Sequence, residues 1–333
     1  MNNGRPLVGI DVGSCTVSVV VAVAEDDKLV IHGCGQARHD GARKGVIANL
    51  DEVSAAVLTA AEEAEAMASL PVELAVVGIG GTPIHGNPSR ATVPVTGRDH
   101  TVSREDVARA LQACANVSIP PDYRVLDIIP CGFALDGHAG MDQPVGMPGR
   151  RLDASAYVLY TNATHADTVE QAVNHASEAV DRLIYEPLAA AEAVLSPDER
   201  DLGCLLLDVG HSTTEWVLFA EGVVVAGSAL PVGGRHFTAD LAAMLKTTTA
   251  AAEQTKRIVG AAVDRAGIGE QAVEVPSLGG EGNQVHAAAF AAEILHERAR
   301  DLLIGVHKML THAKLDRVPR AGVVLTGGGA QLD

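Results

Sequence analysis

Two stretches of the sequence share an arrangement in which an apolar run ends in Asp-Val-Gly and small residues follow. The first is VGIDVGSCTVSVVV at residues 8–21, and the second is LLLDVGHSTTEW at residues 205–216. A glycine-containing turn between two strands can direct several backbone N–H groups at one point, which suits phosphate oxygens. An aspartate just before the turn can hold Mg²⁺ through its waters, because this cation prefers oxygen ligands and keeps much of its hydration. Two such turns facing each other across a cleft predict a clamp on the phosphates of a nucleotide.

Each turn by itself is weak evidence, because Asp-Val-Gly also ends ordinary strands. A third stretch strengthens the prediction, since the apolar residues of VVLTGGG run directly into Gly327, Gly328 and Gly329. A glycine triplet after a buried strand lets a flat ring or a sugar approach the backbone closely. The three stretches together favour nucleotide binding over a chance occurrence of turn residues.

The elements that must position these turns are visible in the apolar pattern. Strands are expected at 7–10, 17–24, 28–37 and 73–81. Helices are expected at 49–70, 165–180 and 187–195, and at about 236–246, 249–262 and 285–313. From residue 83 to about residue 157 the strands become shorter and Pro and Gly more frequent, and Ser103-x-x-Asp106 announces one helix by a capping-box pattern. This change of texture predicts an inserted α+β module.

Composition limits the class of protein. The chain has 333 residues, which is comfortable for two domains, and a formal charge of −17 from 42 acidic and 25 basic residues. That charge argues against nucleic-acid backbones and against anionic lipid as partners. Five scattered cysteines form no C-x-x-C pair, so a reduced, cytosolic chain is expected. The sequence shows neither a secretory signal nor an apolar run near the ~18 residues of a membrane helix.

The three stretches resemble, in order, the first phosphate, second phosphate and adenosine motifs of the actin-like ATPases. In addition, YEPLAAAEAVL at 185–195 resembles the first inter-domain helix of that superfamily. EQTKR at 253–257 resembles the Glu-x-x-Lys helix that brackets the adenosine in the related heat-shock chaperone ATPases. The resemblance implies ATP as the ligand, with Mg²⁺ held through water by Asp11 and Asp208. The residues implied to contact ATP are Asp11, Gly13, Ser14, Cys15, Thr16, Asp208, Gly210, His211, Ser212, Thr213, Gly233, Glu253, Lys256, Gly327, Gly328 and Gly329.

Within this superfamily the chain looks most similar to the bacterial cell-division family FtsA, through AVVGIGGTPIHGNPSRATVPV, PPDYRVLDIIPCGFALDG, QPVGMPGRRLDA and ALPVGGRHFTADLA. The resemblance implies an α/β, actin-like two-domain ATPase fold with an inserted α+β subdomain in the first domain. The implied boundaries are 1–82 and 158–200 for the first domain, 83–157 for the insert, 201–240 and 321–333 for the second domain, and 241–320 for its helical subdomain.

The family resemblance also implies a function. An FtsA-type protein binds ATP, self-associates into filaments and links the FtsZ ring to the inner face of the cytoplasmic membrane at the division site. The implied partners are the C-terminal peptide of FtsZ at the helical subdomain, further copies of the chain, and other division proteins at the insert. Family members continue past the adenosine glycines with a strand, a helix, a flexible tail and an amphipathic membrane helix, so this chain alone is expected to be soluble and unanchored.

Turnover is left open by the sequence. Glu186 stands where the superfamily carries a residue that orients the attacking water, but it also suits the first turn of a helix, next to Pro187. Two side chains, His211 and Ser212, occupy positions where many actin-like proteins have Gly-Gly, and Glu215 stands where Asp is usual. The expected activity is at most that of a weak ATPase. A nucleotide-binding pseudo-ATPase, a pilus-assembly ATPase-like scaffold and a small-molecule kinase of the same superfamily remain alternatives.

Overall fold

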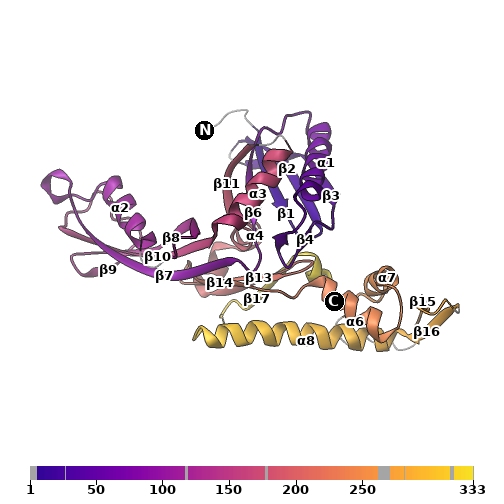
Figure 1. Ribbon diagram of the computed structural model, residues 1–333. Coiled ribbons are helices and arrows are strands. Elements are labelled where there is room, and N and C mark those ends of the chain that lie inside the picture. The colour runs from indigo at the N-terminus through magenta and orange to yellow at the C-terminus, as the bar shows by residue number, and fades with distance from the viewer. Residues whose placement is uncertain are drawn as a thin grey trace. The chain divides into compact units, whose positions relative to one another are not determined.

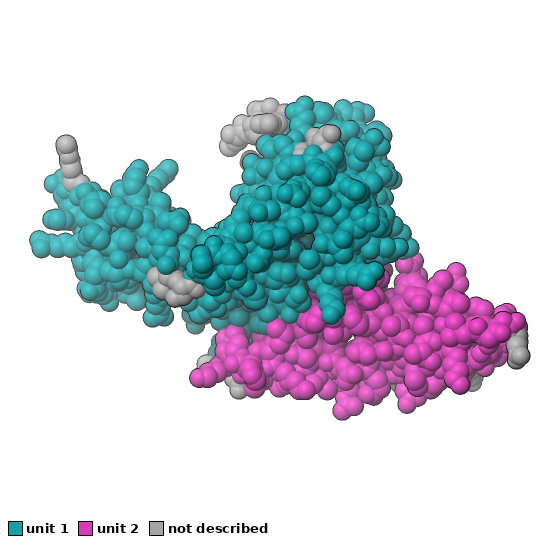
Figure 2. Space-filling view, in the orientation of Figure 1, with its two compact units in different colours: residues 1–206, 216–229, 319–324 teal, residues 207–215, 230–318, 325–333 magenta. Residues whose placement is uncertain are grey.

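The structure is a computed structural model that describes residues 6–26, 28–116, 119–176, 179–261, 271–280, 282–315 and 319–332 (Figure 1). It divides into two compact units (Figure 2). The first unit comprises residues 1–206, 216–229 and 319–324, and the second comprises residues 207–215, 230–318 and 325–333.

The first unit is built on a five-stranded sheet in the order β11-β6-β1-β2-β3. The β1–β2 and β2–β3 pairs are antiparallel, and the β1–β6 and β6–β11 pairs are parallel. The strands are β1 (Leu7–Val12), β2 (Thr16–Glu25), β3 (Lys28–Arg38), β6 (Leu74–Ile79) and β11 (Ala179–Tyr185). A small hairpin, β4 (Ala42–Arg43) with β5 (Val46–Ile47), follows β3. The first Asp-Val-Gly stretch is therefore the β1–β2 hairpin.

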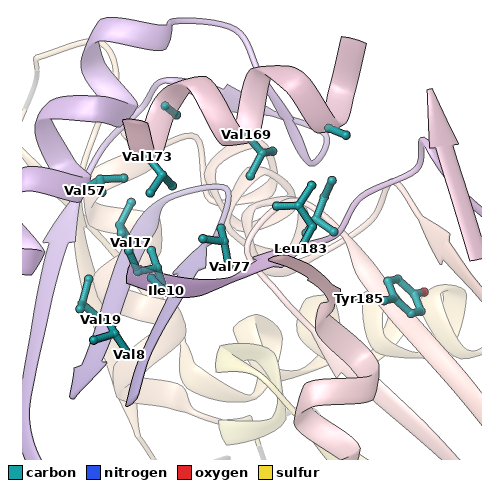
Figure 3. Packing of buried hydrophobic residues seen from close by; sticks show 14 of the residues in the cluster. Val8, Ile10, Val17, Val19, Val57, Val77, Val169, Val173, Leu183 and Tyr185 are labelled. Atoms are coloured by element: carbon teal, nitrogen blue, oxygen red, sulfur yellow. The ribbon is translucent and has the colours of Figure 1, made fainter. Parts of the chain in front are cut away.

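Two helices, α1 (Leu50–Ala68) and α3 (Ala163–His175), contribute their apolar residues to the same core as this sheet (Figure 3). Val8 and Ile10 are buried while Leu7 and Gly9 are exposed, which is the alternation of a strand with one covered face. The helix begins where the sequence indicated, because Asn49 caps α1 by accepting a hydrogen bond from the backbone of Glu52.

Two glycines of β3 allow α1 to lie directly on the sheet. A Cβ atom on Gly35 would collide with the backbone carbonyl of Ala60, and one on Gly33 with that of Ala64. Both carbonyls belong to α1 and are held by its own hydrogen-bond ladder, so they cannot move away cheaply. The distance between α1 and β3 can therefore be this short only because Gly33 and Gly35 have no side chains.

The insert forms its own four-stranded antiparallel sheet in the order β7-β10-β8-β9. Its elements are β7 (Ile84–Pro94), the short helix η1 (Arg98–His100), α2 (Arg104–Ala115), β8 (Tyr123–Leu135), β9 (His138–Met141) and β10 (Arg151–Asn162). The capping box expected at Ser103 is confirmed, with Asp106 bonding back to the Ser103 backbone. Burial opposes the charged form of Asp106, but hydrogen bonds from Ser103 and Thr96 outweigh it and hold its pKa well below the usual range.

Another sheet, in the order β14-β13-β12-β17, carries the second Asp-Val-Gly stretch. Its strands are β12 (Cys204–Val209), β13 (Thr214–Ala220), β14 (Val223–Leu230) and β17 (Val323–Thr326), and α4 (Glu186–Val194) and α5 (Pro197–Leu202) precede it. In the first unit, the hydroxyl of Tyr157 accepts a hydrogen bond from Gly227 N–H, and Tyr185 donates to the carbonyl of Ser228. These two tyrosines attach β14 to the rest of the unit.

The second unit adds α6 (Gly234–Met244), α7 (Thr249–Val259), the hairpin β15 (Ala272–Pro276) with β16 (Asn283–Ala287), α8 (Ala288–His312) and the short helix η3 (Gly328–Gln331). Arg298 on α8 forms a two-pronged ion pair with Asp240 on α6. No helix among the described residues is long and apolar enough to cross a membrane.

Three expected helix ends were wrong. The helix expected over 165–180 ends at His175, and the chain is already in β11 from Ala179, while residues 177–178 lie outside the described part. The helix expected from 285 starts at Ala288, because residues 283–287 pair with β15. The helix expected to reach 262 ends at Val259, where Gly260 adopts φ 62 as a left-handed cap; residue 262 itself is not described.

We expect Gly35→Ala to lower the stability of the protein by about 1–3 kcal/mol, because the added methyl group overpacks the contact with α1. The matched control is Gly9→Ala in β1, where an added Cβ meets no described atom within 4 Å and the expected change is neutral to slightly stabilising. Thermal and urea melts of both variants check this. Equal midpoints for the two variants would contradict the proposed role of Gly35.

Candidate functional site

The first turn, Gly13 to Cys15, connects β1 to β2 in the first unit. Asp11 pairs with Ser18 near the end of β1, and a Cβ on Gly13 would lie 2.9 Å from the Thr16 carbonyl oxygen. This contact shows how tightly the backbone doubles back. Ser14, Cys15 and Thr16, like Gly13, are half-buried.

The second turn, Gly210 to Thr213, repeats this geometry in the second unit. The N–H of Gly210 donates to the carbonyl of Thr213 at 2.9 Å, and a Cβ on Gly210 would lie 3.2 Å from the same oxygen. Neither His211 nor Ser212 has a positive φ, so side chains replace the usual glycines here without left-handed backbone strain. The Ser212 hydroxyl is buried and has no hydrogen-bond partner within the part of the chain that the structure describes, so a polar group at the turn is left unsatisfied.

The N-terminus of α6 closes around this turn. Gly234 N–H donates to the carbonyl of Gly210, and Arg235 N–H donates to that of His211, both at 2.8 Å. A Cβ on Gly233 would lie 2.6 Å from the Gly210 oxygen, so a side chain at this position would push α6 off the turn. The glycine at 233, implied by resemblance to contact ATP, is thus also required by protein packing.

The glycine triplet folds against the end of β12. A Cβ on Gly327, which has φ +81, would collide with a carboxylate oxygen of Asp208 and lie 2.7 Å from the Val209 carbonyl oxygen. A Cβ on Gly329 would collide with the side chain of Val209, whereas one on Gly328 would meet none of the described residues within 4 Å. Two of the three glycines therefore serve the packing of the loop, and Gly328 is the one whose surface is open.

Asp208 is the carboxylate of this half of the site. Its pKa is raised above the usual value because burial removes water from the charged form. A cation beside it would offset that cost by favouring the charged form, so the residue fits a metal held through water. Within the described residues there is no cluster of three or more His, Cys, Asp or Glu that could hold a metal directly.

Glu253 and Lys256 lie on α7 and bond to α6. The carboxylate of Glu253 accepts hydrogen bonds from Thr238 at 2.6 Å and from Arg257 at 3.0 Å, and pairs with Lys256 at 2.7 Å. Lys256 also donates to the hydroxyl of Thr238 at 2.9 Å and to the carbonyl of Gly234 at 3.2 Å. Through Gly234 this network reaches the second turn.

Glu186 is the first residue of α4, and Pro187 follows it in the first turn of the helix. A Cβ on Gly78 of β6 would lie 3.0 Å from Cγ and 3.5 Å from Oε1 of Glu186. The side chain therefore lies over the end of β6, a strand that pairs with β1. Both sequence interpretations, water orientation and helix-start residue, fit this position.

The structure thus gathers the predicted residues within each unit separately. In the second unit, the 210–213 turn, Gly233, the Glu253–Lys256 pair, the triplet and Asp208 form one connected set of contacts. In the first unit, the first turn follows β1, and the side chain of Glu186 lies over the end of β6, the strand that pairs with β1. Sequence reasoning missed His39, whose ring and backbone both contact the first turn.

Known proteins match this chain along its whole length. The profile described as "SHS2 domain inserted in FTSA" matches residues 81–160, and that of "Cell division protein FtsA" matches residues 205–332. The FtsA of Pseudomonas aeruginosa is 33% identical over 100% of this chain and 80% of its own length. The FtsA of Bacillus subtilis is 31% identical over 100% of this chain and 75% of its own length.

The chain belongs to the FtsA family. It is accordingly a bacterial cell-division protein, and the resemblance read from its motifs is confirmed.

Solved structures show the actin-like fold. The PilM-PilN type IV pilus biogenesis complex matches with a TM-score of 0.66 at 16% identity, covering 98% of this chain and 82% of that chain. MreB5 of Spiroplasma citri bound to AMPPNP matches with a TM-score of 0.59 at 13% identity, covering 99% and 86%. The expected fold class, actin-like α/β with an FtsA-type insert, is confirmed.

The Glu253 network predicts a pH dependence in this FtsA family member. Burial opposes the charged form of Glu253, but hydrogen bonds from Lys256 and Thr238 outweigh it and lower its pKa to about 2. A group with a lowered folded-state pKa stabilises the protein above its unfolded pKa and loses that contribution as pH falls through the folded value. The stability difference between the native chain and Glu253→Gln should therefore be largest near pH 7 and shrink from about pH 5 to pH 2.

Thermal melts across that range measure the difference. Glu297→Gln on α8 is the control, since it removes the same charge from an exposed carboxylate 3.6 Å from Arg300. A difference for Glu253→Gln that stays constant between neutral and acidic pH would refute the role assigned to its charge.

Proposed function

We propose that this FtsA family member binds ATP·Mg²⁺ through its two Asp-Val-Gly turns, assembles with further copies of itself, and links the FtsZ ring to the cytoplasmic membrane at the division site. The observation that carries the proposal is the match to FtsA along the whole chain, including the inserted subdomain. The nucleotide part rests on the second turn, where three groups adjoin: a buried hydroxyl without a partner among the described residues, a half-buried carboxylate whose pKa is raised, and an exposed glycine.

Each set of residues has a role in this proposal. Backbone N–H groups of the 13–16 and 210–213 turns, with the Ser212 hydroxyl, bind phosphate oxygens. Asp11 and Asp208 hold the waters of Mg²⁺, which when bound supplies positive charge to the phosphates. The open surface of Gly328 is proposed to admit the adenosine, and the Glu253–Lys256 pair on α7 is proposed to border it. The MreB5 structure, which has the same fold, holds AMPPNP, and this supports a nucleotide as the ligand.

Glu186 is the proposed residue for orienting an attacking water in the first unit. Positioning and electrostatics dominate phosphoryl transfer, so one weakly basic carboxylate is consistent with slow turnover. A nucleotide-binding scaffold without turnover remains the second form of the same proposal. The pilus-assembly alternative is favoured by fold likeness alone, whereas the sequence relatives named above are cell-division proteins.

The helical part of the second unit, residues 241–320, is the proposed docking site for the C-terminal peptide of FtsZ. Large apolar side chains are exposed there, on which an amphipathic segment could lie. Among the described residues they are Met244, Ile258, Leu278, Val285, Phe290, Leu303 and Ile304. The insert is proposed to contact other division proteins.

We expect Asp208→Asn to weaken ATP binding at least about tenfold in the presence of Mg²⁺, because the variant keeps the shape of the side chain but loses its charge. The loss should largely disappear when the metal is chelated. Isothermal titration measures both affinities. Asp301→Asn, which removes an exposed carboxylate of α8, controls for the change in net charge.

A separate variant, Glu186→Ala, should release phosphate from ATP more slowly than the native chain while binding ATP with unchanged affinity.

An Asp208→Asn variant that binds ATP as well as the native chain, with and without Mg²⁺, would count decisively against the nucleotide site. Equal losses of affinity and turnover in Glu186→Ala would leave that residue with the structural role only.

The FtsZ proposal predicts that a synthetic C-terminal peptide of FtsZ from the same organism binds the chain with a Kd of roughly 1–100 μM. Modest affinity is expected because a disordered segment pays the ordering entropy when it binds. Fluorescence anisotropy of the labelled peptide measures it, with a scrambled peptide of identical composition as the control. Indistinguishable titrations of the two peptides would remove the claim.

A further inference from the structure

His39 connects the first turn to the start of helix α1. It follows β3 directly and is buried, with 5% of its surface exposed. Its ring nitrogen Nε2 lies 2.9 Å from the carbonyl oxygen of Gly13, and the N–H of Gly41 donates to its Nδ1 at 3.2 Å. Its own backbone N–H donates to the carbonyl of Cys15 at 3.0 Å. One residue therefore contacts both ends of the turn.

The partners decide which ring nitrogen carries the proton. A backbone N–H can only donate, so Nδ1 must accept and is the bare nitrogen. Nε2 then carries hydrogen and donates to the Gly13 carbonyl, which can only accept. Two backbone groups therefore fix which ring nitrogen of His39 donates and which accepts.

The bond to Gly13 orients the turn. The peptide unit between Gly13 and Ser14 is planar and trans, so its N–H points opposite to its carbonyl. Because His39 holds that carbonyl, the N–H of Ser14 is directed away from the histidine. Ser14 is one of the residues proposed to bind phosphate oxygens.

The other side of the histidine is fixed to α1. The carbonyl of Gly41 accepts hydrogen bonds from Ala48 N–H at 2.8 Å and from Asn49 N–H at 2.9 Å, and Asn49 caps α1. The N–H of Asp40 donates to the carboxylate of Glu52, in the first turn of α1, at 2.6 Å. The segment that carries the ring is thus attached to a 19-residue helix of the core.

We propose that His39 is a positioning residue of the first phosphate-binding turn, a role that rests on the proposed ATP function. It transmits the rigidity of α1 to the turn through Nε2, and the Nδ1 contact with Gly41 only orients the ring. A histidine that merely fills the core would make both contacts equally dispensable for nucleotide binding. The two nitrogens therefore need to be tested separately.

Two substitutions separate them. In His39→Gln the amide nitrogen reaches the place of Nε2 and keeps a donor for Gly13. In His39→Asn the amide oxygen takes the place of Nδ1 and keeps an acceptor for Gly41, but the donor to Gly13 is lost. Tyr157→Phe is the control, since it removes a buried side-chain bond to the backbone of Gly227 in the same unit.

We expect His39→Asn to weaken ATP binding about fivefold to tenfold, the effect of losing one neutral hydrogen bond. His39→Gln and Tyr157→Phe should stay within about twofold of the native chain. Hydrogen–deuterium exchange of a peptide covering residues 12–18, measured without nucleotide, should accelerate in His39→Asn and not in His39→Gln. Thermal melts establish that all three variants are folded.

Equal ATP affinities and equal exchange for His39→Asn and His39→Gln would overturn the positioning role. If the native chain bound no ATP, the proposed function would fail, and the exchange measurement would still decide whether His39 orders the turn. The two failures are therefore distinguishable.

Discussion

The close approach of backbone to backbone at the end of β12 is the constraint on which the second half of the site depends. Three segments far apart in the sequence meet the turn that follows Asp208: the start of α6, the glycine triplet and, through Gly234, the side chain of Lys256. Side chains at Gly233, Gly327 or Gly329 would collide with that turn or with β12. The carbonyls of Gly210 and His211 each accept one hydrogen bond from the start of α6, so the turn is held in place before any ligand binds. Because the turn is already ordered, less conformational entropy is lost when a ligand binds.

Much of this architecture could be predicted from the residues. Both Asp-Val-Gly stretches are strand–turn–strand units, as their apolar runs and glycines indicated, and Asn49 and Ser103 start helices by the capping chemistry read from the sequence. These features are local: each is decided by neighbours within a few positions. The family could also be predicted from the sequence, because the nucleotide motifs and the inserted module occur in a fixed order along the chain.

What could not be predicted depends on contacts between distant residues. The helix expected over 165–180 stops at His175, and from Ala179 the chain pairs with β6; apolar periodicity contains no information about that partner. The glycine triplet was interpreted as room for a ligand, yet Gly327 and Gly329 are required by β12, and only the fold shows this. His39 carried no motif at all; its importance arises from a tertiary contact with Gly13, 26 positions earlier.

The strand β10 has a consequence for how the first unit comes apart. Its even-numbered residues Leu152, Ala154, Ala156 and Val158 belong to the core of the insert, whereas Tyr157 and Leu159 belong to the core around the main sheet. A single strand thus forms part of the wall of two cores, one on each face. Unfolding of the insert would remove β10 from the core around the main sheet as well. The two cores are therefore expected to unfold together in one cooperative transition rather than as separable foldons. The insert is in this sense not a detachable module, although it has a sheet and a core of its own.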